Sequence, residues 1–147
     1  MSTAEFADWL DITRTILRYG RYADQRRFAD MASLFVPDGR MLLYRPRADH
    51  PAETPRGTAE LVAAFEALTA FVATSHALSP SDVEVRGDTA RVHTACLSHH
   101  IRETSEGRIR FTLADRYDDD LVRVDGRWLF RERRKYTDWA ETTPLRR

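Results

Sequence analysis

The fold is decided near the C-terminus by the stretch LVRVDGRWLF, residues 121–130. Val122 and Val124 precede the pair Asp125-Gly126, and Trp128 and Phe130 follow it, with a spacing of two on each side. A spacing of two is typical of half-buried strands. Asp-Gly readily adopts the positive φ angles that a two-residue hairpin turn requires. The stretch therefore predicts a tight antiparallel hairpin.

The region from His76 onward keeps this period of two. Gly87-Asp88 separates two runs rich in strand-forming residues, and residues 104–107 make a second turn. We therefore expect four long strands joined by hairpins. Together they form an antiparallel meander over the second half of the chain.

The first half of the chain has the period of helices. Ser2, followed three residues later by Glu5, is a capping box and predicts the start of a helix. Apolar residues then recur at the i, i+3, i+4 and i+7 positions, and the next position along this stripe is Asp24. The stripe consists of Phe6, Trp9, Leu10, Thr13, Ile16, Leu17 and Gly20.

Two more helices and one strand are expected before the meander. A short helix must stop at Val36-Pro37, because the residue before a proline disfavours the helical conformation. Residues 41–44 are expected to form a strand, and a third helix covers residues 58–72. The expected buried positions are Phe28, Met31, Ala32 and Phe35 on the short helix and Leu61, Phe65, Leu68 and Val72 on the long one.

Length and charge indicate one ordinary globular domain over residues 1–147. Basic and acidic residues both number 23, so no excess positive charge is available for binding nucleic acid. No apolar run is long enough to span a membrane, and the N-terminus lacks a signal-peptide pattern, so we expect a cytoplasmic protein. We interpret the C-terminal arginines as ion-paired or solvent-exposed; they are Arg131, Arg133, Arg134, Arg146 and Arg147.

The predicted order α-α-β-α-β-β-β-β defines an α+β domain. This order and several motifs resemble the NTF2-like superfamily, in particular its SnoaL-like branch, whose members include scytalone dehydratase, lindane-type dehydrochlorinase, ketosteroid isomerase and polyketide cyclases. The resemblance implies a cone with a deep apolar pocket, in which three N-terminal helices pack on a curved, mainly antiparallel sheet. The matching segments are residues 19–24, 35–38, 74–76, 87–90, 117–128, 133 and 138–139.

Asp24 and His76 are the first candidates for catalysis. On the apolar stripe, Asp24 would carry a carboxylate into the core, which is costly unless a partner holds it. In the dehydratase and the dehydrochlorinase that the chain resembles, the matching aspartate orients a histidine that matches His76. Such a carboxylate sets the histidine tautomer and raises its basicity. Taken alone, Asp24 could instead cap the second helix, and His76 could be a structural histidine.

His100 is a further catalytic candidate. It shares a strand face with small, mostly uncharged residues such as Thr94, Cys96 and Ser98. This is what a pocket wall requires, and His100 matches a second active-site histidine of scytalone dehydratase. A buried structural histidine is the alternative.

Four tyrosine hydroxyls are expected to reach the cavity. Tyr44 resembles a tyrosine that helps the dehydratase activate water or a leaving group, so it is a catalytic candidate. Tyr19, Tyr22 and Tyr117 are candidate substrate-binding residues, and Tyr117 falls where the family has an asparagine. Each tyrosine could also be an ordinary core residue with one satisfied hydroxyl.

Arg133 matches a dehydrochlorinase arginine that stabilises a departing anion, which makes it a substrate-binding candidate. The alternative, which we favour slightly, is a cross-strand ion pair with the acidic run at residues 115–120. Within that run, residues 118–120 are expected to form a solvent-exposed strand end.

We expect no metal and no cofactor. Asp24, His76 and His100 would formally make a metal-binding triad, but the sequence has no closely spaced pair of ligands, and the similar family works without metal. Cys96, the single cysteine, is expected to pack as a small apolar residue.

These observations predict a cofactor-independent acid-base enzyme (a lyase or dehydratase, an isomerase or a cyclase). Its substrate would be a hydrophobic small molecule that is polyketide-like, aromatic or steroid-like. The alternative is a non-catalytic ligand-binding or assembly domain, like the β subunit of ring-hydroxylating dioxygenases. A homodimer or higher homo-oligomer is expected through the outer sheet face around Leu97 and Ile101. The proline-rich loop at residues 45–57 is expected to lie at the cavity mouth as a lid without regular hydrogen bonds.

Overall fold

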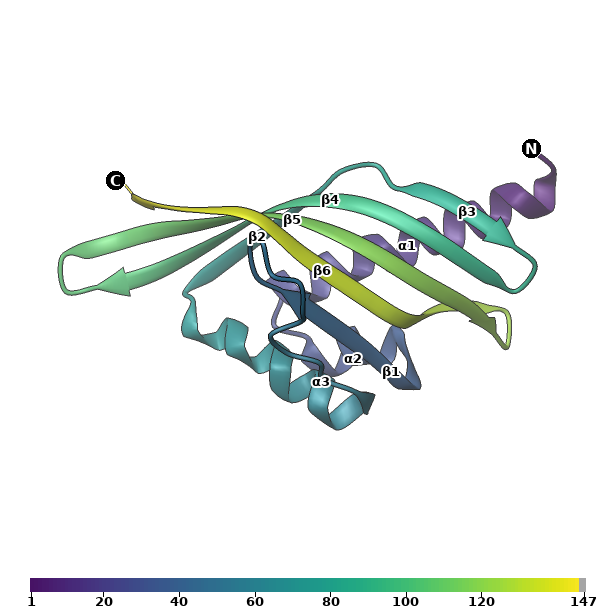
Figure 1. Cartoon of the computed structure of the whole chain (residues 1–147), viewed down its shortest axis with the longest axis horizontal. Coiled ribbons are helices and arrows are strands. Elements are labelled where there is room, and N and C mark those ends of the chain that lie inside the picture. Colours follow the sequence, from purple (N-terminus) through teal and green to yellow (C-terminus); the bar gives the residue numbers. More distant parts are fainter. Residues whose placement is uncertain (146–147) are drawn as a thin grey trace.

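The computed structural model describes residues 1–145, and Arg146 and Arg147 of the predicted solvent-exposed end lie outside this range. Three helices pack on one side of a long, twisted six-stranded sheet (Figure 1). The predicted α+β class is confirmed. In chain order the elements are α1 (Thr3–Asp24), α2 (Phe28–Ser33), β1 (Phe35–Tyr44), α3 (Gly57–Phe65), the 3-10 helix η1 (Glu66–Ala70), β2 (Ala73–Leu78), β3 (Asp82–Arg86), β4 (Thr89–Thr104), β5 (Gly107–Val124) and β6 (Arg127–Pro144).

The strand order in the sheet is β1-β6-β5-β4-β2, and β3 also pairs with β4. Among the strand pairs of the described residues, β1 and β6 alone are parallel. The meander has five strands instead of the expected four, because the first is split into β2 and β3 around Ser79–Ser81. Pro80 has no N–H to give to a ladder, and the backbone N–H of Ala95 on β4 donates to the Ser79 hydroxyl at this break instead.

The three predicted hairpin turns are confirmed. Asp125 and Gly126 have φ angles of 50° and 75°, the left-handed pair that joins β5 to β6. Gly87 joins β3 to β4, and the turn after Thr104 joins β4 to β5. These turns set the register of the sheet and therefore decide which side chains of β4, β5 and β6 face the helices.

The capping box of α1 is present, but the predicted apolar stripe is partly wrong. Phe6 and Leu17 are each 51% exposed, and Phe6 stacks on Trp9 with ring centres 6.0 Å apart. The first turns of α1 project past the end of the sheet, where there is no core to bury them (Figure 1). The buried face is Ile12, Thr15, Ile16, Tyr19, Gly20 and Ala23.

Two predicted helix ends also change. Helix α2 ends at Ser33, and Phe35 is the first residue of β1, because the backbone becomes extended before Pro37 sooner than expected. Helix α3 tightens into η1 at Glu66 and stops at Ala70, so Val72 leaves the buried face and is 55% exposed. None of the helices among residues 1–145 combines the length and the apolar character needed to cross a membrane.

The loop between β1 and α3 is more ordered than predicted. The N–H of Leu43 donates to the carbonyl of Glu53 at 3.0 Å, and the N–H of Ala52 donates to the carbonyl of Leu43 at 2.7 Å. The N–H of Met41 donates to the carbonyl of Pro55. The prolines do not prevent these bonds, because other residues supply the donors. The loop therefore runs back along the free edge of β1.

Candidate active site

Asp24, at the end of α1, and His76, on β2, form the predicted hydrogen bond. Nδ1 of His76 lies 2.7 Å from Oδ1 of Asp24. The same carboxylate accepts the hydroxyl of Thr74 and the backbone N–H of His76, each at 3.0 Å. The His76 side chain is 8% exposed and the Asp24 side chain 29%. Three donors therefore hold the carboxylate in one orientation.

Gly20 and Arg26 bring these two residues together. A Cβ atom on Gly20 would lie 3.1 Å from Leu78 and 3.4 Å from the Cβ of His76, so the glycine lets α1 approach β2 closely. Arg26 then ties the end of α1 to the start of β2. Its guanidinium donates to the Thr74 hydroxyl at 2.7 Å and to the carbonyl of Phe71 at 3.1 Å. Neither positioning role was predicted from the sequence.

The Asp24 carboxyl is ionised at neutral pH. Partial burial acts to raise the pKa of Asp24, but the hydrogen bonds from His76 and Thr74 outweigh burial and hold this pKa below its ordinary value. An ionised carboxylate only accepts hydrogen bonds, so Nδ1 of His76 carries the proton that points at Asp24. The other ring nitrogen, Nε2, is then the free base.

A cavity of about 130 Å³ lies against His76. It is smaller than a usual drug-sized ligand pocket and smaller than the predicted deep pocket, because large side chains fill much of the cone. Its size is close to that of an apolar cavity of about 150 Å³ that binds benzene. The lining residues are Tyr19, Ala23, Met31, Met41, Leu43, Ala64, Phe65, Ala67, Leu68, His76, His100, Tyr117 and Lys135.

His100 projects from the inner face of β4 into the same cavity, on the strand face that was predicted. Its ring centre lies 5.9 Å from that of His76 and 4.7 Å from that of Phe71. The residue is 5% exposed, and its buried Nδ1 atom has no hydrogen-bond partner among residues 1–145. Burial lowers the pKa of His100 to about 4, with smaller contributions from His76 and Lys135. His100 is therefore neutral at physiological pH.

Lys135 and Asp115 belong to the site and were missed in the sequence. The ammonium of Lys135 lies 3.3 Å from Oδ2 of Asp115, whose side chain is fully buried. Asp115 also accepts the hydroxyls of Ser98 at 3.1 Å and Thr137 at 2.6 Å. Lys135 is the only lysine in the chain and lies two residues after Arg133, on the same face of β6. This spacing of two residues was the sequence signal from which an inward-facing Lys135 could have been predicted.

The four predicted tyrosines lie in different surroundings. Tyr19 and Tyr117 line the cavity and contact each other edge to face. Tyr22 is instead covered by the guanidinium of Arg27, 4.4 Å from its ring centre, and is not among the lining residues. Tyr44 stacks on Tyr136 with ring centres 4.5 Å apart.

Tyr44 lines a neighbouring hollow of about 300 Å³. Leu43 and Lys135 line both spaces, so the hollow adjoins the cavity that contains His76. Arg45, Pro46 and other residues of the loop after β1 line this hollow as well. The loop therefore lies beside the site, although its hydrogen bonds to β1 were not predicted.

Arg133 forms a sealed ion pair with Asp119. Both side chains are 0% exposed, and the guanidinium donates to the two carboxylate oxygens at 2.9 and 3.0 Å. The rings of Tyr19, Tyr117 and Phe130 surround it at 3.9–4.5 Å. The cross-strand pairing is confirmed, whereas the predicted exposure of Asp119 is wrong. Arg133 does not line the cavity, because its guanidinium is enclosed by these rings.

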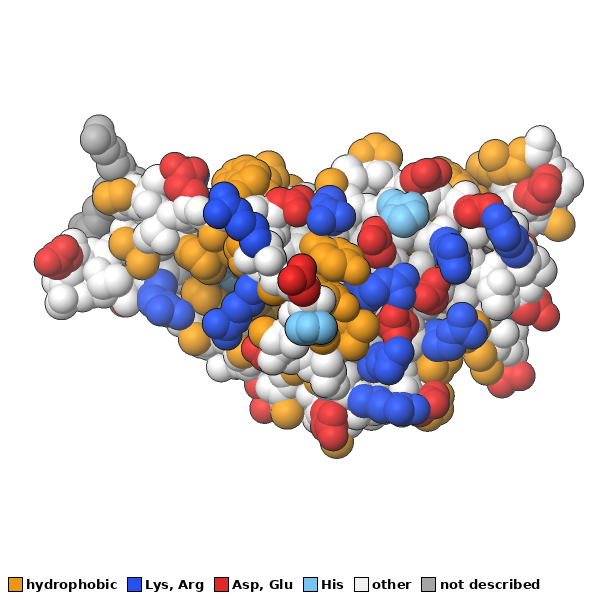
Figure 2. Space-filling view, viewed as in Figure 1, with side chains coloured by type: hydrophobic (Ala, Val, Ile, Leu, Met, Phe, Trp, Pro, Cys, Tyr) orange, Lys and Arg blue, Asp and Glu red, His pale blue; other side chains and the backbone are white. Residues whose placement is uncertain are grey.

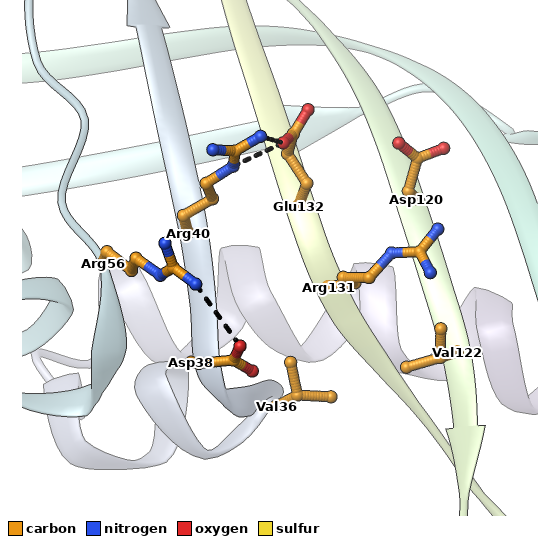
Figure 3. Close-up of a pocket in the computed structure, with 8 residues that line it drawn as sticks. All are labelled: Val36, Asp38, Arg40, Arg56, Asp120, Val122, Arg131 and Glu132. Carbon is orange, nitrogen blue, oxygen red and sulfur yellow. Dashed lines mark hydrogen bonds and ion pairs between the residues drawn. The ribbon is translucent and has the colours of Figure 1, made fainter.

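A larger hollow of about 630 Å³ lies on the opposite face of the sheet (Figure 3). The side chains of β1 that line this hollow, such as Arg40, alternate along the strand with buried side chains. They therefore lie outside the cone. Ion pairs join Arg40 to Glu132 and Arg56 to Asp38. Three arginines and three acidic residues line the hollow, so its formal charge is balanced. No histidine is among the residues that line it.

Two other chemistries find little support in the geometry. Burial raises the pKa of the Cys96 thiol to about 12, which keeps it protonated. Within the part of the chain that the structure describes, there is no group of three or more histidine, cysteine or acidic side chains that could hold a metal ion.

The fold and the site define an NTF2-like α+β cone with an aspartate-histidine pair at its inner cavity. The SnoaL-like domain matches residues 4–134, and the chain belongs to this family. An uncharacterised protein of Mycobacterium tuberculosis is 30% identical over 128 residues, which are 87% of this chain and 84% of the relative.

Solved structures share the fold. A protein from Novosphingobium aromaticivorans, provisionally named as a scytalone dehydratase, is 25% identical with a TM-score of 0.83 over 99% of this chain and 94% of that one. A hexachlorocyclohexane dehydrochlorinase is 19% identical with a TM-score of 0.77 over 97% of this chain and 91% of that one. The second likeness concerns the fold alone.

Proposed function

We propose that this protein is a cofactor-independent acid-base enzyme that takes a proton from a hydrophobic small molecule. One observation carries the proposal: His76, at the cavity wall, has its Nδ1 atom 2.7 Å from the ionised carboxylate of Asp24. This arrangement leaves Nε2 as a base whose conjugate acid Asp24 stabilises. A positioned base of this kind contributes about 10²–10⁴-fold to a reaction rate.

The reaction we favour is an elimination such as dehydration, ahead of isomerisation or cyclisation. The support is the 25% identity to the protein provisionally named as a scytalone dehydratase. In an elimination, His76 removes the proton from carbon, and the leaving group departs with the bonding electrons. The reaction transfers a proton and no electrons to the protein, so it needs no redox cofactor.

The size of the cavity favours a compact substrate. A space of about 130 Å³ suits one aromatic or polyketide-derived ring and is too small for a steroid in this conformation. The adjoining hollow of about 300 Å³ can receive a larger substituent, since Leu43 and Lys135 line both spaces.

The proposal is tested with a panel of single-ring β-hydroxy ketones. Elimination is followed by ultraviolet absorbance, and exchange of the acidic proton in heavy water is followed by NMR. We expect turnover or exchange with the wild type and its loss in Asp24→Asn. The control is Asp11→Asn, an exposed site on the same helix. Binding without turnover or exchange in the wild type would overturn the proposal.

That outcome would favour the second candidate, a non-catalytic ligand-binding or assembly domain. The small size of the cavity supports this candidate, because a largely filled cone offers little room for a substrate. The two candidates differ in one measurable property, which is proton exchange on a bound ligand.

We also propose that two copies associate through the outer sheet face (Figure 2). Leu97, Ala114 and Trp139 are paired across β4, β5 and β6, and Leu97 and Trp139 are 43% and 50% exposed. An exposed apolar row between charged side chains favours self-association. Light scattering at micromolar concentration is expected to give a multiple of 17.0 kDa, and a monomer mass would refute the pairing.

A further inference from the structure

Lys135 is the one positively charged group among the residues that line the cavity against His76. Its side chain remains 21% exposed, although its partner Asp115 is fully buried. This differs from Arg133 two residues earlier, which is 0% exposed and enclosed by three aromatic rings. Of the two inward-facing cations of β6, Lys135 is therefore the one that a molecule in the cavity can reach.

Asp115 does not depend on Lys135 alone. It accepts hydroxyl hydrogen bonds from Ser98 at 3.1 Å and from Thr137 at 2.6 Å. The ammonium has three N–H donors, and the ion pair with Asp115 at 3.3 Å leaves donors for a ligand oxygen. In a mostly apolar cavity such a donor acts more strongly than it would in water.

The charges around the cavity indicate whether the ligand that binds Lys135 is anionic or neutral. Asp24 and Asp115 are two carboxylates, Lys135 and Arg26 (whose guanidinium donates to Thr74 beside Asp24) are two cations, and His100 is neutral, so the formal charges around the cavity balance while His76 is neutral. A permanently anionic ligand would bring an unbalanced negative charge into the cavity. A neutral ligand that becomes negative only when His76 removes its proton keeps the charges balanced, because the proton stays beside Asp24.

We propose that Lys135 binds the carbonyl oxygen of a neutral ketone and stabilises the enolate that forms when His76 removes the neighbouring proton. This inference rests on the proposed acid-base function and names its substrate class. The C–H bond breaks, its proton moves to Nε2 of His76, and its electron pair forms the C=C bond of the enolate. The negative charge moves to the oxygen beside Lys135. The enolate then re-forms the carbonyl group as the C–O bond to the β-hydroxyl breaks, and the hydroxyl takes the proton from Nε2 of His76 and leaves as water.

His100 is placed to assist this step. Its buried Nδ1 atom has no partner within the described residues, and its ring centre is 5.9 Å from that of His76. The neutral ring directs its one N–H at the backbone of Phe111, so Nδ1 can accept a hydrogen bond from the β-hydroxyl group of the ligand. A hydrogen bond to the ligand would satisfy Nδ1 of His100, which is otherwise buried without a partner at a cost in free energy.

The experiment uses 4-nitrophenol as an enolate mimic, because its neutral and ionised forms absorb at different wavelengths. An ammonium close to the phenol oxygen is expected to favour the bound phenolate by about 10- to 1000-fold relative to water. Spectra of the bound probe are recorded across a pH series with the full-length protein. The readout needs no turnover, so it is independent of whether elimination occurs.

Two variants with opposite expected effects are compared. Lys135→Gln removes the cation and is expected to return the bound probe toward its ionisation in water. Asp115→Asn leaves Lys135 without its carboxylate partner and is expected to raise the bound phenolate fraction above that of the wild type. Arg134→Gln, on the outer face of β6, is the control and is expected to leave the spectra unchanged.

The inference is overturned if the wild type does not bind the probe, or binds it without favouring the phenolate. It is also overturned if Lys135→Gln leaves the ionisation unchanged, which a purely structural ion pair predicts. Asp115→Asn retains the cation and gives an independent reading if Lys135→Gln does not fold. The proposed function fails separately, when the wild type neither turns over nor exchanges protons in the ketone panel.

Discussion

Asp119 and Asp24 each hold a basic partner inside the cone, and these two pairs differ in access. Asp119 and Arg133 are both 0% exposed and share two hydrogen bonds, with aromatic rings around the guanidinium. Asp24 and His76 share one side-chain hydrogen bond, and His76 borders a cavity. The first pair has no free face, whereas the second leaves one nitrogen of the imidazole available to a ligand.

The comparison separates a structural pair from a reactive one. Arg133 cannot lose its proton near neutral pH, and its position among Tyr19, Tyr117 and Phe130 fixes it in the core. His76 binds Asp24 through Nδ1 and borders the cavity, so its Nε2 atom is left to accept a proton from a ligand. Burial alone therefore does not identify a site. A basic partner with one nitrogen left free beside a cavity does.

The largest effect is expected from Asp24→Asn. Asparagine can keep much of the hydrogen bonding but loses the charge that favours protonated His76, so the rate of proton exchange or elimination is expected to fall by about 10²–10⁴-fold. The matched control is Asp119→Asn, which should lower stability yet retain activity per folded molecule. Activity within about tenfold of the wild type in Asp24→Asn would remove the distinction between the pairs.

Arg133→Met is expected to act on stability. It leaves the Asp119 carboxylate buried without a cation, which costs about 3–5 kcal/mol in the free energy of unfolding. The double variant Asp119→Leu/Arg133→Met is expected to recover most of this loss, because it removes both charges. Urea denaturation measures both values. A single variant as stable as the wild type would show that the pair is not sealed.

His100 gives a pH dependence on the cavity side. Its folded pKa of about 4 lies below the ordinary value of 6.5, so as the pH falls from 6.5 to 4 the unfolded chain takes up a proton that the folded protein refuses. Stability contributed by His100 is therefore present above pH 6.5 and is lost toward pH 4. The loss is at most about 1.4 kcal/mol per pH unit.

Urea midpoints at several pH values test this dependence. His100→Gln is expected to flatten the curve between pH 4 and 6.5, whereas His50→Gln, in the exposed loop, should leave it unchanged. His76, Lys135 and Asp115 also act on His100, so each variant is compared with the wild type at every pH. A curve that is equally steep without His100 would contradict the assignment.

The smallest effect is expected from shortening the loop. Deleting residues 47–51 keeps Arg45, Pro46 and Ala52, which line the hollow beside the cavity. The shortened protein should fold normally but bind 4-nitrophenol about threefold more weakly, equivalent to roughly 0.6 kcal/mol, and exchange it faster. Equal affinity and equal exchange rates would show that the loop does not act as a lid.

Local pattern was enough for much of the fold. The three turns, the capping box at Ser2 and the inward face of β4 were predicted, because φ preferences and the alternation of a strand depend on neighbouring residues. Residues at the ends of elements were predicted less well. Phe6 and Val72 fit a helical period, but whether such a residue is buried depends on what lies opposite it.

The candidate site shows the same division. The resemblance to a family singled out Asp24, His76 and His100, and the structure brings the three together. Tyr22 matched a helix position near the site, yet its ring pairs with Arg27. Lys135 and Asp115 escaped notice, because β6 carries many charged residues and their spacing does not tell which one meets a cavity.

By itself, then, the sequence determined the class of fold and the hairpin turns, and its resemblance to a family indicated the pairing of a carboxylate with a histidine. Only the tertiary structure decided that Arg133 is sealed and that Lys135 is accessible, although both point inward from the same strand. The physical reason is that alternation along a strand is set locally by the backbone. What covers each side chain is set by segments distant in the sequence, here the rings of Tyr19 and Tyr117 over Arg133 and the open cavity beside Lys135.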